Sequence, residues 1–193
     1  MTPSFPLALH LEDKPCLVVG SGLEARDRAR ALDEVHARVE VVAEAPCAEL
    51  SEFAHRRSLP LAVRAFDARD LDGKWLAVLT DRDFSLGARM AALCEERRVL
   101  FCATDQAQRN SFSHLALARA GVVTAAIGTQ GRAPALGRKL REELERVFEE
   151  ADLARFADEL ATLRDATPPE ARRAVLAQAL AHVCFEGRLK LLP

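Results

Sequence analysis

The chain has 193 residues, of which 29 are acidic and 27 are basic, so its formal net charge at pH 7 is −2. This length is enough for one substantial domain with an appendage and a sizeable core. The near-neutral balance argues against the broad basic surface that binds nucleic acid or an anionic membrane. No apolar run approaches the length of a membrane span, and the first residues lack the basic start of a signal peptide.

We therefore expect a cytoplasmic protein with no nucleic-acid or membrane partner. The five cysteines are an odd number at irregular spacings, which indicates neither a disulfide framework nor a zinc site. Several of them lie in apolar runs, where we expect buried reduced thiols. The cysteines are Cys16, Cys47, Cys94, Cys102 and Cys184.

The first predicted element is the strand CLVV at 16–19, which ends at a glycine turn. Gly20, Gly22 and Ala25 have the spacing G-x-G-x-x-A, and a charged helical pattern follows at once. The first glycine permits the turn, the second lets the backbone approach a pyrophosphate, and the alanine lets helix pack closely on strand. Amides at the helix start would face this anion. The stretch predicts dinucleotide binding, and the alternative is an ordinary strand–helix turn.

Strands and helices alternate as far as residue 103. The expected helices cover 23–35, 48–57 and 84–97, and the further strands cover 38–43, 61–66, 75–80 and 99–103. This alternation predicts βαβ units in a parallel sheet. Ligands of such sheets bind beyond the carboxyl ends of the strands, so the residues at those ends should lie together. They are Gly20, Glu44, Thr80, Asp81, Thr104 and Asp105.

The alternation stops after residue 110. Two strand-like runs, 112–118 and 122–127, are too close for a crossover helix and predict a hairpin-type pair outside the parallel sheet, which often serves dimerisation. Pro134 suits the first turn of a helix expected over 135–150. Residues 151–193 carry two more helical patterns, split at 165–169.

Motifs along most of the chain fit one known family in their order and spacing. They are Phe5-Pro6-Leu7-Ala8-Leu9, VVGSG through Arg28-Ala29, ARVEVVAEAP, Trp75 to Asp81, Asp105 with Ser111-Phe112, and IGTQGRAPALGRKLREELE at 127–145. On these residues the chain resembles the dehydrogenase module of siroheme synthase, known alone as precorrin-2 dehydrogenase and sometimes also as sirohydrochlorin ferrochelatase.

The resemblance implies an α/β fold with three parts. A Rossmann-type parallel sheet domain that binds NAD would cover 1–111, a dimerisation and substrate segment 112–150, and a helical C-terminal region 151–193. The implied protein is a homodimer that oxidises precorrin-2 to sirohydrochlorin with NAD in siroheme biosynthesis. Some members of this family also insert ferrous iron to give siroheme.

The chain departs from the family's pattern at several positions. Ser21 replaces the middle glycine of the turn, Gln130 replaces a later glycine, and Ala133 replaces a serine. The stretch after Asp81 lacks a second Asp and an Asn, and His36 stands where the family has a turn glycine. Histidine enters left-handed conformations more readily than most residues. These departures keep open a second class of function, a degenerate Rossmann dimer that binds NAD or a tetrapyrrole without turnover.

Asp105 is the candidate catalytic base. Dehydrogenation sends a hydride to the nicotinamide and a proton to a base, and a carboxylate beside the macrocycle can accept that proton. The alternative is an Asx-type residue that stabilises the following loop. His114 is a second candidate, as a proton shuttle or an iron contact, against a structural role in a hairpin strand. No second His or Cys lies at ligand spacing from it, so no resident metal is predicted.

The remaining candidates are contacts to the cofactor and the substrate. Glu44 follows the second strand, where an acid would hold the adenosine ribose, although a solvated loop charge fits equally well. The opening of the 135–150 helix offers amides and a cation to the acid groups of the substrate. The candidates are Gly20, Ser21, Gly22, Leu23, Glu44, Thr80 and Asp81 for NAD, and Thr129, Gly131, Arg132 and Arg109 for the substrate. The chain does not resemble a short-chain reductase, because such enzymes use a Tyr as the acid and this chain contains no Tyr.

Overall fold

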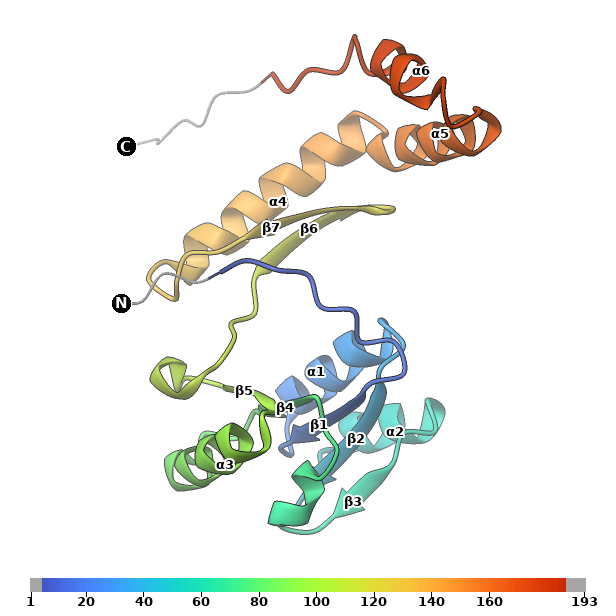
Figure 1. The fold of residues 1–193 in the computed structure, drawn as a ribbon. Helices are drawn as coiled ribbons and strands as arrows, with labels where there is room; N and C mark the ends of the chain where they lie inside the picture. Colours follow the sequence, from blue (N-terminus) through green and yellow to red (C-terminus); the bar gives the residue numbers. More distant parts are fainter. Residues whose placement is uncertain (1–4, 187–193) are drawn as a thin grey trace, which may run out of the picture. The chain divides into compact units, whose positions relative to one another are not determined.

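The computed structural model of the chain describes residues 5–186. Five parallel strands form one sheet in the order β3-β2-β1-β4-β5 (Figure 1). This order reverses direction at β1, which has β2 on one side and β4 on the other. Such a switch point is where open α/β sheets bind ligands. The strands are β1 (Pro15–Val19), β2 (Arg38–Ala43), β3 (Leu61–Val63), β4 (Leu76–Leu79) and β5 (Leu100–Ala103).

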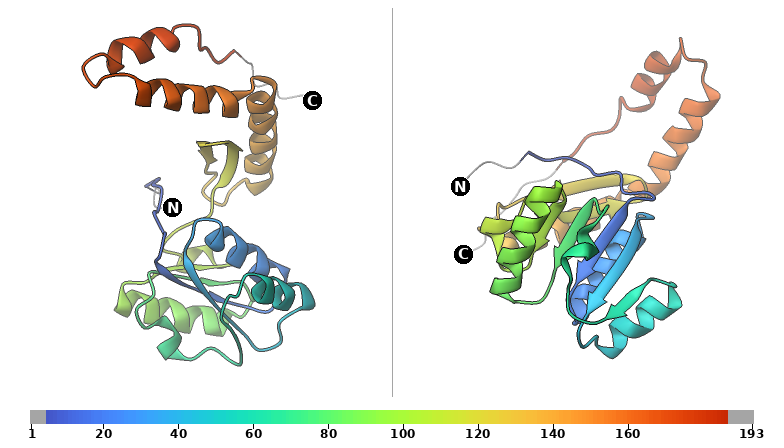
Figure 2. Two further views of the ribbon diagram at one scale, coloured as in Figure 1. Left: turned by 90° about the vertical axis from the view of Figure 1, so that its right-hand side faces the viewer. Right: turned by 60° about the horizontal axis from the view of Figure 1, so that its bottom comes forward.

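Helices cover both faces of this sheet, as the apolar strands require (Figure 2). Successive β1 residues point to opposite faces, so Cys16 and Val18 join one core cluster while Leu17 and Val19 join the other. The first cluster contains the buried side chains of α1 (Leu23–Asp33) and α2 (Ala48–Arg56), and the second contains those of α3 (Phe84–Arg97). The Rossmann-type parallel sheet expected from the sequence is confirmed.

The first helix and the third strand of the sheet domain end two and three residues earlier than expected. The helix after the glycine turn ends at Asp33 rather than at residue 35, and His36 then adopts a left-handed φ of +58°. β3 ends at Val63 rather than at residue 66. The chain then leaves the sheet over residues 64–67, and Asp67 forms a capping box on the short 3-10 helix η1 (Ala68–Leu71).

The chain divides into two compact units between His114 and Leu115, three residues later than the boundary expected from the sequence. Phe112 explains this shift, because its ring packs against the core of the first unit. The strand expected from residue 112 therefore begins only at residue 116. η2 (Ala107–Arg109) is a 3-10 turn in the segment that connects β5 to this point.

The second unit consists of a β-hairpin and three helices. β6 (Ala116–Ala120) pairs antiparallel with β7 (Val123–Ile127) through a two-residue turn, Gly121-Val122. α4 (Pro134–Glu150) packs mainly on β6 and begins with Pro134, as expected. α5 (Leu153–Ala166) and α6 (Arg172–Ala179) match the two helical patterns expected after residue 150, as far as the structure describes this region.

The expected burial of the cysteines holds for three of them. Cys16, Cys94 and Cys102 are buried, whereas Cys47 is half-buried and Cys184 is exposed. Burial raises the pKa of Cys16 to about 11, of Cys94 to about 12 and of Cys102 to about 11. These three thiols are protonated and unreactive at neutral pH. No helix among residues 5–186 is long and apolar enough to cross a membrane.

Candidate functional site

The turn after β1 is held by close packing against the end of β4. Gly20 has a φ of +146°, and a Cβ atom at this position would lie 2.0 Å from Thr80 Oγ1. Backbone conformation and packing therefore both require glycine here. Thr80 is 5 % exposed and its hydroxyl donates to Val19 O at 3.4 Å. The structure thus places Thr80, a predicted cofactor contact, underneath the turn as its support.

Gly22 differs from Gly20, because nothing in the described part of the chain requires a glycine there. Its φ of −96° and ψ of −172° are open to any residue, and an added Cβ would meet no atom within 4 Å. Gly22 is the N-cap of α1, and no side chain caps the helix amides that follow. The missing side chain leaves room for an anion to approach these amides, which is what a dinucleotide pyrophosphate requires. The residues present therefore fit the cofactor.

Ser21 connects this turn to the ends of two other strands. Its backbone N–H donates to Asp81 Oδ1 at 3.1 Å, directly after β4. Its hydroxyl accepts a hydrogen bond from Ala45 N at 3.4 Å, directly after β2. Glu44 is the exposed neighbour of Ala45. Four predicted cofactor residues (Ser21, Glu44, Thr80 and Asp81) thus lie at one edge of the sheet around the glycine turn.

Asp105 follows β5 and is exposed at the same edge, with a left-handed φ of +58°. Its Oδ2 accepts a hydrogen bond from Arg82 Nε at 2.6 Å, and this pairing raises the pKa of Arg82. Other side chains fix the loop. The Asn110 side chain accepts a hydrogen bond from Ala103 N at 2.7 Å and donates one to Ala103 O at 3.1 Å. In the same way, Ser111 Oγ accepts from Phe101 N and donates to Phe101 O. The carboxylate of Asp105 is therefore directed at Arg82 rather than used to stabilise its loop.

Gln106 anchors the chain directly after Asp105. Its side chain is fully buried and donates to Asp83 O at 3.2 Å, at the start of α3. A Cβ on Gly87 of α3 would lie 2.2 Å from the Gln106 amide oxygen, so only glycine permits this close approach. Arg109, a predicted substrate contact, donates to the same amide oxygen at 3.3 Å. Asp105 is thereby attached to α3 through its neighbour.

Glu24 is a further acid at this edge. It lies in the first turn of α1 and accepts a hydrogen bond from the Thr104 hydroxyl at 2.8 Å and one from Arg28 at 3.4 Å. Its charge also acts on Arg82 and raises the pKa of that guanidinium. Neither Glu24 nor Arg82 is among the residues predicted from the sequence. Their positions directly after the glycine turn and after β4 are the signal that could have indicated them.

His114 lies in the segment between η2 and β6, not in the expected strand, and its ring packs edge-on against Phe112 at 5.3 Å. The surrounding protein displaces water from the ring and lowers its pKa to about 4, and the charge of Arg28 adds to this shift. The side chain keeps an exposed surface, so solvent moderates the shift. The imidazole is neutral at pH 7 and therefore able to accept a proton.

The other predicted substrate residues belong to the second unit. Thr129, Gly131 and Arg132 form the turn before α4, in which Arg132 N donates to Thr129 O at 3.0 Å. Gln130 has a φ of +52°, a left-handed conformation that explains the glycine of the family motif. No side chain caps the start of α4, so its amides face the surroundings beside Arg132.

A surface hollow of about 680 Å³ lies at the opposite edge of the sheet, where the strands begin. Its charged lining includes Lys74 and Glu40, which pair with each other at 2.5 Å. The Lys74 side chain is 7 % exposed, so its charge is already compensated inside the protein. Ligands of parallel sheets bind at the carboxyl ends instead. We therefore assign the functional site to the glycine-turn edge.

Comparison with known proteins identifies the family to which the chain is similar. The model of a family described as "Putative NAD(P)-binding" matches residues 7–116. Siroheme synthase of Thioalkalivibrio sulfidiphilus is 33 % identical over 141 residues, which are 73 % of this chain and 29 % of that protein. The siroheme synthases of Citrobacter koseri and Salmonella typhimurium are 31 % identical over 157 residues, 80 % of this chain and 34 % of theirs. The chain thus spans about a third of the curated relatives it matches.

Among solved structures, one described as "SirC, precorrin-2 dehydrogenase" superimposes with a TM-score of 0.73. The match covers 91 % of this chain and 88 % of that chain at 20 % sequence identity. At this identity the likeness concerns the fold. Together the matches confirm the family resemblance found in the sequence.

The open space at Gly22 gives a direct test of the site. Replacing Gly22 by Val should abolish NAD binding, measured by calorimetry, because the side chain would fill the space that the pyrophosphate needs. The changed N-cap should cost only about 1 kcal/mol, a shift in Tm of roughly 2–4 °C. Gly20→Ala is the contrasting variant, which should lose stability because its Cβ overlaps Thr80. Unchanged NAD affinity in a folded Gly22→Val protein would remove the glycine turn from the site.

Proposed function

Since the chain belongs to this NAD(P)-binding family, we propose that it is an NAD-dependent dehydrogenase that oxidises precorrin-2 to sirohydrochlorin in siroheme biosynthesis. The observation that carries the proposal is the arrangement at the switch point of the sheet. A glycine turn with room for a pyrophosphate and an exposed carboxylate, Asp105, lie at the same edge. The names of the relatives, siroheme synthase and precorrin-2 dehydrogenase, supply the substrate class.

The cofactor would be held by the residues around the glycine turn. Gly22 and Leu23 offer the amides at the start of α1 to the pyrophosphate, while Gly20 keeps the turn against β4. Glu44, exposed at the end of β2, is placed to accept hydrogen bonds from the adenosine ribose. NAD, when bound, supplies the hydride acceptor of the reaction.

Asp105 would accept the proton that leaves the substrate as the hydride departs. It is exposed, and its loop is fixed from both sides by Gln106 and Asn110, so the carboxylate stays at the edge where the cofactor binds. His114 is neutral at pH 7 and is the next candidate for the base. We assign the acid groups of the substrate to Arg109 in the first unit and, separately, to the turn of Thr129, Gly131 and Arg132 in the second unit, which combines a cation with uncapped helix amides.

A binding protein without turnover is the second candidate function. One observation favours it: Arg82 already engages the Asp105 carboxylate, which makes a base less available. An anaerobic assay of the purified protein with precorrin-2 and NAD distinguishes the two functions. If the protein is a dehydrogenase, the absorbance of sirohydrochlorin should increase with time. If it binds NAD or precorrin-2 but oxidises no precorrin-2, it is a binding protein.

Asp105→Asn tests the catalytic assignment. Asparagine keeps the shape of the side chain but cannot accept a proton at neutral pH, so oxidation of precorrin-2 should fall roughly 10²-fold or more. NAD affinity should stay unchanged, because Asp105 is not among the cofactor contacts. Normal turnover by this variant would exclude Asp105 as the base and leave His114 as the candidate. Insertion of ferrous iron into sirohydrochlorin involves no hydride transfer, so its rate, assayed separately, need not fall together with the rate of oxidation.

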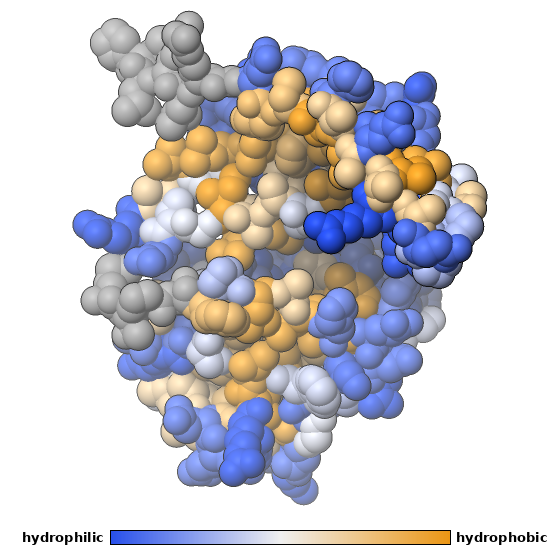
Figure 3. Space-filling view, turned by 45° about the horizontal axis from the view of Figure 1, so that its top comes forward, coloured by the Kyte–Doolittle hydropathy of each residue, from blue (hydrophilic) through white to orange (hydrophobic). Residues whose placement is uncertain are grey.

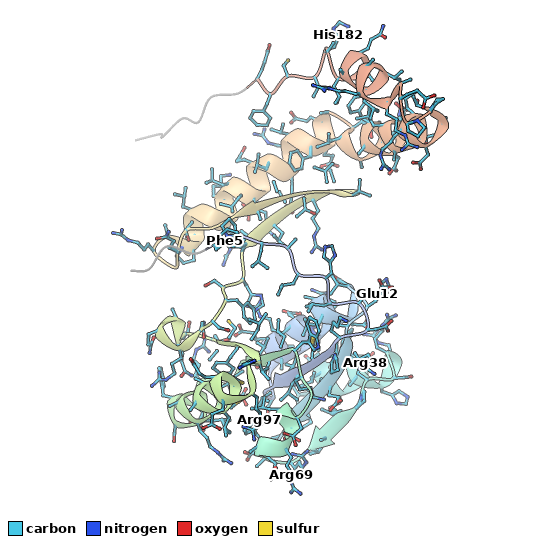
Figure 4. The ribbon with its side chains drawn as sticks, viewed as in Figure 1. Phe5, Glu12, Arg38, Arg69, Arg97 and His182 are labelled. Carbon is cyan, nitrogen blue, oxygen red and sulfur yellow. The ribbon has the colours of Figure 1, made fainter. Side chains whose placement is uncertain are left out.

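Glu44 should make the enzyme prefer NAD over NADP, because its carboxylate would repel a 2′-phosphate. In Glu44→Ala the ratio of kcat/KM for NAD to that for NADP should fall about tenfold, equivalent to about 1.4 kcal/mol. Glu12→Ala is a suitable control. Glu12 is also exposed, but it precedes β1 and so lies at the opposite edge of the sheet (Figure 4). An equal ratio in all three proteins would mean that Glu44 is only a solvated loop charge.

We also propose a homodimer that is built on the hairpin of the second unit. A two-stranded sheet is marginal by itself, and within residues 5–186 no third strand pairs with β6 or β7, so that a strand of a second chain could be added. Apolar side chains are exposed on this unit as well, among them Val122 and Leu136. Figure 3 shows hydrophobic residues at the surface of one face of the molecule. The dimerisation segment proposed from the sequence covers residues 112–127, and we now limit it to the two strands β6 and β7.

Light scattering at micromolar concentration tests this assembly. The expected mass is twice the 21.2 kDa of the chain. A mass of one chain under these conditions would contradict the proposed dimer.

A further inference from the structure

We propose that Arg82 binds an acid group of the substrate and thereby determines specificity for a polycarboxylate. The inference rests on the proposed function, which it deepens by assigning a further substrate contact in the first unit, besides Arg109. It starts from the ion pair between Arg82 Nε and Asp105 Oδ2, at 2.6 Å.

This ion pair uses only one nitrogen of the guanidinium. Among residues 5–186, Arg82 has no other hydrogen bond or ion pair, and its side chain is 69 % exposed. Its two terminal nitrogens are therefore available to a ligand. A planar guanidinium presents donors in a fork that matches the two oxygens of a carboxylate.

The backbone of Arg82 is held on both sides. Asp81 accepts the hydrogen bond from Ser21 N in the glycine turn, and Asp83 caps α3 by accepting from Ser85 N and Leu86 N, both at 2.9 Å. Arg82 thus projects from a fixed point between the cofactor turn and α3. This placement suits recognition, because little order must be created when a ligand binds.

The charges at this edge show why a cation is needed there. Three acids, Asp81, Asp83 and Glu24, are each compensated by backbone amides or by neighbouring side chains. Asp105 is exposed, and among residues 5–186 the cation that pairs with it is Arg82. A substrate that carries several carboxylates would otherwise meet the uncompensated negative charge of Asp105, the proposed base. Arg82 neutralises this charge and still has donors for the ligand.

Arg28 is a less suitable cation at the same edge. Its Nε is enclosed by the protein without a hydrogen-bond partner, and a terminal nitrogen donates to Glu24 at 3.4 Å. Its side chain is 33 % exposed, about half the exposure of Arg82. The comparison favours Arg82 as the residue that meets the substrate.

The test compares Arg82→Gln and Arg82→Lys with the wild-type protein. Arg82→Gln should raise KM for precorrin-2 and the Kd for sirohydrochlorin about tenfold or more, the usual scale for a lost charged hydrogen bond. Arg82→Lys should recover part of this loss, because it restores the charge but not the fork. NAD affinity should be the same in all three proteins.

Arg69→Gln is the matched control. Arg69, labelled in Figure 4, also forms an exposed ion pair, with Asp67. It belongs to η1, in the connection between β3 and β4, and its ion pair involves neither the glycine turn nor Asp105. This variant should change neither KM nor the Kd for sirohydrochlorin.

Unchanged KM and unchanged sirohydrochlorin affinity in Arg82→Gln would overturn the inference. A fall in kcat alone would overturn it too, because Arg82 would then only position Asp105. If the wild-type protein binds sirohydrochlorin but never oxidises precorrin-2, the dehydrogenase proposal fails, while the affinities of the variants still decide the role of Arg82. If it neither binds nor oxidises a tetrapyrrole, both proposals are wrong.

Discussion

The close packing of Gly20 on Thr80 is the constraint on which the functional edge of this protein depends. It brings the turn after β1 so near to the end of β4 that a single Cβ atom would not fit between them. Because of this approach, Ser21 reaches Asp81, and the start of α1 stays fixed at the point where the strand order reverses. The cofactor turn and the strand ends that carry acids therefore form one rigid edge instead of a set of separate loops.

Side chains that bond to backbone groups extend this rigidity to the loop after β5. The Asn110 side chain forms hydrogen bonds with the backbone N–H and C=O of Ala103, as a neighbouring strand would, and the Ser111 hydroxyl does the same for Phe101. β5 is the last strand of the sheet, so these residues supply partners at an edge that no further strand covers. The loop that carries Asp105 is thus fixed by short polar side chains, and the carboxylate itself remains available for chemistry.

The sequence predicts the sheet well, because its signals are local. The apolar run at 16–19, the glycine spacing and the alternation of strands with helices each lie within a few residues of one another. The errors arise where contacts between residues distant in the sequence determine the structure. Phe112 packs against the core of the first unit, so the hairpin begins only at residue 116. The same reason explains why the pairing of Glu24 and Arg82 with other residues of this edge is missed, although their positions after the glycine turn and after β4 can be read from the sequence. Their partners, Thr104 and Asp105, lie 80 and 23 positions away, so no local pattern reveals the pairing.

Gln106 and Gly87 have a consequence for how this protein can change over evolution. The buried amide of Gln106 occupies the volume that any side chain at residue 87 would need. An alanine at 87 favours the helix by about 1 kcal/mol in isolation, yet here it forces the amide out of its place. A shorter residue at 106 would open a cavity unless residue 87 grew at the same time. Each substitution is harmful alone and tolerable with the other, so descendants should retain both residues or exchange both together.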